Sequence, residues 1–93
     1  DLGGFREVSE AKARKAYLAA LFRARSQGSL EGVLRSAQGF ADLGDRRIVE
    51  QCIREARSVA AATRDPRAEE RVRIFAERWA ERAIEVDHQG LVP

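Results

Sequence analysis

The chain has 93 residues, which suffices for one small domain and leaves no room for a separate catalytic domain. Its hydrophobic content of 44% is ordinary for a globular protein, and its net charge of +2 is too small by itself to imply a nucleic-acid partner. A single cysteine excludes an internal disulfide, and the absence of a long apolar run or a signal-peptide pattern predicts a cytoplasmic protein that does not enter a membrane.

The first expected helix covers residues 9–27. Ser9 is a typical N-cap and Gly28 a typical residue after a helix end. Between them, apolar residues recur at helical spacing: Ala13, Tyr17, Ala20, Leu21 and Ala24. Lys12, Lys15 and Arg23 project from the opposite side, and residues 11–30 contain no acid. This helix is therefore expected to carry a basic face, and residues 1–8, which lack periodicity, are expected to be irregular.

The second expected helix covers residues 29–43, with Ser29 as its N-cap and Gly44 after its end. Its apolar stripe consists of Leu30, Val33, Leu34, Ala37, Phe40 and Ala41. A second stripe, on another side, contains only the small residues Gly32, Ser36 and Gly39. Glycine inside a helix costs about 0.5–1 kcal/mol relative to alanine. Two glycines there indicate either a closely approaching backbone or glycines tolerated on an exposed face.

The third and fourth expected helices cover residues 45–63 and 65–87. Asp45 and Asp65 are the N-caps, and Pro66 suits a first helical position because its missing N–H is not needed there. The third helix has the most regular apolar stripe: Ile48, Val49, Cys52, Ile53, Ala56, Val59, Ala60 and Thr63. The stripe of the fourth consists of Ala68, Val72, Phe75, Ala76, Trp79, Ala83 and Val86. Ile74 and Ile84 lie off that stripe and are candidates for contact with another subunit.

Short connections between such helices predict antiparallel neighbours. We therefore expect an all-α protein in which four antiparallel helices form one domain over residues 9–88. Residues 89–93 are taken as a tail outside the fold, because the last three look like the start of a thrombin-cleavage linker.

One stretch, residues 30–63, resembles a tetratricopeptide repeat. That family places a small residue and an aromatic on its first helix, glycine in the turn, and small, large and small residues on its second. The matching positions here are Ala37, Phe40, Gly44, Val49, Ile53 and Ala56. The resemblance covers about a third of the chain, so both tetratricopeptide-like hairpins and an unrelated small four-helix bundle remain open.

The resemblance implies a binding groove lined by the first helix of each repeat. On this chain that helix would present Glu31, Arg35, Gln38 and Asp42. The family's carboxylate clamp uses lysine and asparagine at such positions, and this chain has neither there.

Catalytic, metal and cofactor chemistry is not indicated. Cys52 and His88 are the only thiol and imidazole, and Cys52 stands in the middle of an apolar stripe, where an inert thiol is expected. One cysteine and one histidine do not complete a zinc site, and no phosphate-binding glycine motif occurs. We therefore expect a protein that is not an enzyme and needs no cofactor.

A helical module that binds a partner protein or peptide is the favoured interpretation. Two alternatives stay open. One is a small nucleic-acid-binding protein that uses Lys12, Lys15 and Arg23, and the other is a homo-oligomerisation domain that uses Ile74 and Ile84.

Overall fold

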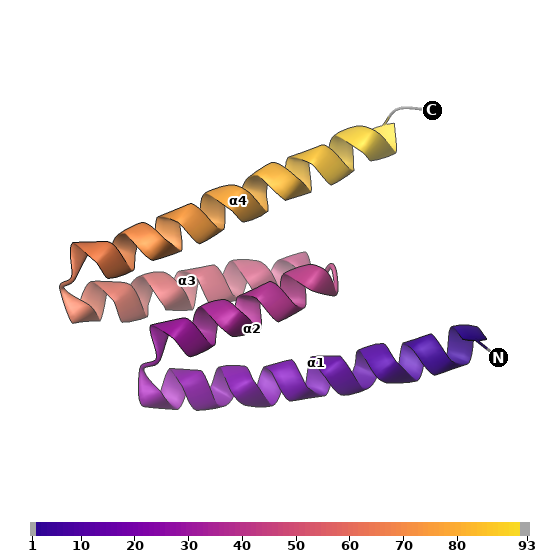
Figure 1. Cartoon of the computed structure of the whole chain (residues 1–93), viewed down its shortest axis with the longest axis horizontal. Helices are drawn as coiled ribbons and strands as arrows, with labels where there is room; N and C mark the ends of the chain where they lie inside the picture. The colour runs from indigo at the N-terminus through magenta and orange to yellow at the C-terminus, as the bar shows by residue number, and fades with distance from the viewer. Residues whose placement is uncertain (1, 92–93) are drawn as a thin grey trace.

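The computed structural model describes the backbone of residues 2–91 and the side chains of residues 8–84. Within residues 2–91 the chain forms four helices and no strands: α1 (Leu2–Gln27), α2 (Leu30–Asp42), α3 (Arg46–Thr63) and α4 (Pro66–Leu91). Successive helices run in opposite directions (Figure 1). The prediction of an all-α fold with four antiparallel helices is confirmed.

The helices are arranged side by side in chain order. α2 packs against both α1 and α3, α3 packs against α4, and a smaller contact joins α2 to α4. α1 and α4 lie on opposite sides of the central α2–α3 pair (Figure 1). The α-carbons extend over 48 × 32 × 15 Å. Because the axes of packed helices lie roughly 8–10 Å apart, the shortest dimension has room for no more than two helices, and the molecule is flat. This open arrangement leaves hollows between helices that a more compact packing would close.

The core lies between α2 and α3 and extends to Leu21 and Ala24 of α1 and to Val72 of α4. Its largest fully buried side chains are Phe40, Val33, Val49, Val72 and Cys52. Burying an apolar side chain of this size contributes about 1.5–3 kcal/mol. The predicted stripes of α2 and α3 supply most of this core, which confirms them, whereas Val86 of the α4 stripe lies outside the residues whose side chains are described.

The small-residue stripe of α2 faces α1. A Cβ built on Gly32 would lie 2.7 Å from the Cβ of Ala24, and one built on Gly39 would lie 2.8 Å from the ring of Tyr17. Ser36 is buried and donates its hydroxyl to the carbonyl of Gly32 at 3.0 Å. The stripe therefore marks a close approach of α1, and α2 is covered on two sides.

Three predicted caps are confirmed by their hydrogen bonds. The Ser29 hydroxyl accepts from the amide of Gly32 at 3.1 Å, and the Asp45 carboxylate accepts from the amide of Ile48 at 3.3 Å. The Asp65 carboxylate accepts from the amide of Arg67 at 2.9 Å, one residue after Pro66 begins α4. These bonds satisfy helix amides that would otherwise lack partners, so the turns sit where the sequence places them.

Both outer helices are longer than predicted. α1 begins at Leu2, so the predicted N-cap at Ser9 and the irregular segment before it are wrong. No proline interrupts the chain there, and the helix runs through Gly3, Gly4 and Ser9 although glycine and serine are not strong helix formers. α4 continues to Leu91 past its predicted end at Asp87, so residues 89–91 belong to the helix and not to a tail.

Candidate functional site

A hollow of about 540 Å³ lies between α2 and α4, and we call it the α2–α4 groove. Its walls combine apolar side chains, three arginines and one amide. The lining residues are Leu34, Gln38 and Ala41 from α2, and Arg71, Ile74, Phe75, Arg78, Trp79 and Arg82 from α4. Because α2 and α4 touch only lightly, the space between them stays open to solvent.

The floor of the α2–α4 groove is apolar. Phe75 and Trp79 stand one helical turn apart on α4, are partly buried, and pack against the core together with Leu34 and Ala41 of α2. Ile74 stands at the groove with 37% of its surface exposed. Covering an apolar floor that is partly open to water lowers the free energy, so this floor favours the binding of a partner.

The rim of the α2–α4 groove is basic. Arg71, Arg78 and Arg82 line it, and no carboxylate of residues 8–84 does. Within residues 8–84, none of these three side chains forms a hydrogen bond or ion pair. The positive charge at this rim is therefore not compensated by the described part of the molecule.

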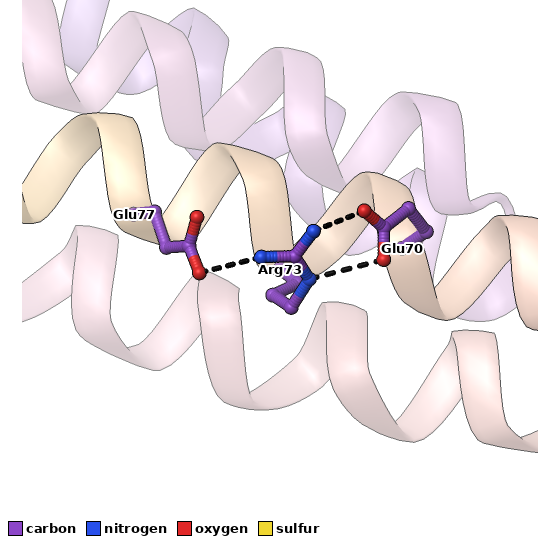
Figure 2. Close-up of polar contacts among 3 residues, drawn as sticks. All are labelled: Glu70, Arg73 and Glu77. Atoms are coloured by element: carbon purple, nitrogen blue, oxygen red, sulfur yellow. Dashed lines mark hydrogen bonds and ion pairs between the residues drawn. The ribbon is translucent and has the colours of Figure 1, made fainter.

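Another arginine of α4 is paired in full. Figure 2 shows Arg73 between Glu70 and Glu77: its Nε donates to Glu70 at 3.0 Å and its Nη1 to Glu77 at 2.6 Å, and a second bond to Glu70 completes a bidentate pair. The hydrogen bonds from Arg73 hold the pKa of Glu70 below its usual range. Arg73 and Glu77 line a different hollow, against Ala60 and Ala61 of α3. Glu70 and Glu77 are thus engaged by Arg73 and not by the groove arginines.

The four groove residues expected from the sequence do not lie in one groove. Glu31, Arg35, Gln38 and Asp42 are all exposed along one face of α2. Arg35 pairs with Glu31 at 2.8 Å, and Gln38 donates to Asp42 at 2.9 Å. Only Gln38 lines the α2–α4 groove.

Glu31 and Arg35 instead line a second hollow, between α1 and α2. The predicted face is therefore a ridge that separates two hollows. It forms a ridge because α2 has a neighbour on each flank, and positions 31 and 35 lie on the α1 side of its exposed face.

The basic face of α1 consists of three residues. Lys12, Lys15 and Arg23 are exposed. Two further arginines of α1 turn toward the end and the middle of α3 instead: Arg14 forms an ion pair with Asp45, and the Nε of Arg25 lies 3.1 Å from Oε1 of Glu55. These two pairs tie α1 to α3 past α2 and compensate two positive charges of α1 outside the basic face.

Ile74 and Ile84 are both exposed but do not line the same hollow. Ile74 belongs to the α2–α4 groove, whereas Ile84 is 67% exposed and lines none of the hollows described above. Ten positions separate them, which is about 15 Å along a helix and places them on different sides of α4.

Cys52 lies in the core with none of its surface exposed, and burial raises the pKa of its thiol to about 11. It is an unreactive thiol at neutral pH, because the nucleophilic form of cysteine is the thiolate. His88 lies outside the residues whose side chains are described. Among the described residues, no three histidine, cysteine or carboxylate side chains gather closely enough to hold a metal ion.

Of the described helices, none combines the length and the apolar character needed to span a bilayer. Comparison with family models, curated proteins and solved structures finds no match to this chain. Sequence reasoning did not single out the arginines on the α4 side of the groove, Arg71, Arg78 and Arg82. Their spacing of seven and four positions indicates that they share one face of a helix. That face lines a groove only because α2 lies beside it.

Proposed function

We propose that this chain is a non-catalytic helical interaction module that binds a segment of a partner protein in the α2–α4 groove. The observation that carries the proposal is the groove itself. It is about 540 Å³ in volume and has aromatic side chains in its floor and, at its rim, arginines that pair with no side chain of residues 8–84. Such a combination of an apolar centre and a polar rim is typical of protein interaction surfaces.

A tetratricopeptide-like organisation is part of this proposal. In that family the first helices of successive repeats lie next to each other and line the binding groove. Here α2 and α3 would form one repeat and α4 would be the first helix of the next. The direct contact between α2 and α4 and the hollow between them support this assignment. A cytoplasmic location, where Cys52 stays reduced, completes the proposal.

Two isoleucines of α4 provide a matched test. A random dodecapeptide library is selected against the wild-type protein, and the affinity of each selected peptide is measured by fluorescence anisotropy. Ile74→Asn changes the groove, and Ile84→Asn makes the same chemical change on the same helix outside it. Peptides that bind in the groove lose affinity about tenfold with Ile74→Asn and keep it with Ile84→Asn.

Both variants change exposed side chains, so both are expected to fold, which circular dichroism checks. Selected peptides that are indifferent to Ile74→Asn would contradict the groove assignment. Binding that depends on Lys12, Lys15 and Arg23 instead would move the binding surface to α1.

A further inference from the structure

Three arginines form a line along the rim of the α2–α4 groove. Arg71, Arg78 and Arg82 are separated by seven and four positions, which on a helix puts successive residues roughly 10 Å and 6 Å apart along the axis. All three line the same hollow. A ligand in the groove therefore meets a row of guanidinium groups and not a single charge.

Three acids near this row, Asp45, Glu70 and Glu77, already pair with other arginines. Asp45 lies in a smaller adjoining hollow with Arg82, but it forms an ion pair with Arg14. Glu70 and Glu77 of α4 hold Arg73 on the α3 side of the helix (Figure 2). Among the described residues of α4, the groove arginines are thus the cations that are positioned to bind a negatively charged group of a ligand.

We infer that the segment bound in the α2–α4 groove is acidic, with two or three carboxylates facing the arginine row and a bulky apolar side chain on the floor formed by Phe75 and Trp79. This inference rests on the proposed function and specifies its ligand. Arginine pairs with carboxylates through two parallel hydrogen bonds, so a row of arginines selects acidic residues at matching intervals. The aromatic floor supplies the apolar contact that charge alone does not.

A protein segment fits this groove better than a nucleic acid does. Nucleic acids bind by stacking bases on open aromatic faces and by contacts to phosphates along an extended basic track. Phe75 and Trp79 are partly covered by the core, and Glu77 lines a different hollow together with Arg73, which also pairs with Glu70. A short acidic segment meets the arginines without approaching these acids.

Two triple variants test the inference with the same change in net charge. Arg71, Arg78 and Arg82 are all replaced by glutamine in the first, and Lys12, Lys15 and Arg23 are all replaced by glutamine in the second. Groove-binding dodecapeptides, identified by their sensitivity to Ile74→Asn, are sequenced, and their affinities for both variants are measured. The inference predicts that aspartate and glutamate are enriched relative to the starting library. It also predicts an affinity loss of at least about tenfold with the groove variant and a small loss with the α1 variant, as well as affinity that falls as salt rises.

Each result is decisive. Peptides that depend on Ile74 but lack acidic enrichment, or that tolerate the groove variant, overturn the acidic ligand and leave the proposed function standing. A set of peptides in which none depends on Ile74 overturns the proposed function itself. Equal losses of affinity with both triple variants would mean that the peptides respond only to the net charge of the protein, and this result also overturns the inference. A fluorescent single-stranded oligonucleotide is tested in the same way. If it binds through the groove arginines and no acidic peptide does, the ligand is a nucleic acid and the inference is overturned.

Discussion

Gly39 of α2 lies directly against the ring of Tyr17 of α1: a Cβ at position 39 would come within 2.8 Å of three ring carbons. The same ring packs edge-on against Phe40, with centroids 5.8 Å apart and an interplanar angle of 65°. The position of the Tyr17 ring therefore depends on the absence of a side chain at Gly39 and on the aromatic ring of Phe40. This contact fixes how closely α1 approaches the core.

Gly39→Ala is expected to destabilise the protein although alanine favours helices. The helix gains about 0.5–1 kcal/mol from the substitution, but crowding in a packed interface costs about 1–3 kcal/mol, so the net expectation is a loss of about 1–2 kcal/mol. Urea denaturation measures it. Gln38→Ala, at the exposed neighbouring position, is the control and should stay within about 0.5 kcal/mol of wild type. If Gly39→Ala is instead more stable, the close approach of α1 is wrong.

The pair of Arg25 and Glu55 predicts an asymmetric response to substitution. The side chain of Glu55 is 18% exposed and that of Arg25 46%, and Oε2 of Glu55 is buried without a partner. Removing Arg25 leaves a carboxylate without its cation in a poorly hydrated place, whereas removing Glu55 leaves an arginine that can turn into water. Arg25→Gln should therefore cost about 1 kcal/mol and Glu55→Gln less.

The control for this pair is Arg23→Gln, on the exposed basic face of the same helix. Its stability should stay within about 0.5 kcal/mol of wild type. A loss as large as that of Arg25→Gln would indicate a general charge effect and not the contact with Glu55.

Asp45 makes part of the stability depend on acid pH. The hydrogen bond from Arg14 holds the pKa of this carboxyl below its usual value of 3.8, against the opposing effect of burial. Because the folded-state pKa is the lower one, the stabilisation is complete above about pH 4–5 and is lost as the pH falls below that range through the folded-state value. Asp45→Ser keeps an N-cap oxygen and removes the charge. Urea midpoints of this variant should therefore fall less steeply between neutral and strongly acidic pH than those of wild type, and parallel curves would contradict the assignment.

Cys52 is expected to react only when the protein opens. Burial raises its pKa to about 11, so the folded state keeps the thiol protonated where the unfolded chain, with a value near 9.0, releases the proton. Stability should therefore decline as the pH rises above about 9, and this decline should be absent from Cys52→Ala. At neutral pH, reaction with a disulfide reagent should be slower by orders of magnitude in buffer than in denaturant. Fast labelling of the native protein would place Cys52 outside the core.

Local sequence patterns determined the helices, the caps and the core of this protein. Ser29 and Asp45 accept the bonds expected of N-caps, and the stripes of α2 and α3 become the buried core, because capping and helical periodicity are properties of neighbouring residues. The glycines at positions 32 and 39 left open either a close backbone or an exposed face, and the packing of α1 decided for the first. The ends of α1 and α4 were misjudged because Ser9, read as an N-cap, lies inside α1, and α4 continues past Asp87 to Leu91.

The candidate site was decided by tertiary structure. Gln38 and Arg78 are forty positions apart, and no pattern within either helix indicates that they line the same hollow. Likewise, Arg14 and Arg25 look like members of a basic face until Asp45 and Glu55 are brought to them by the packing of α3. A helix sequence determines which side chains share a face, whereas the angle and distance of the neighbouring helix determine whether that face is buried, paired or left open as a groove.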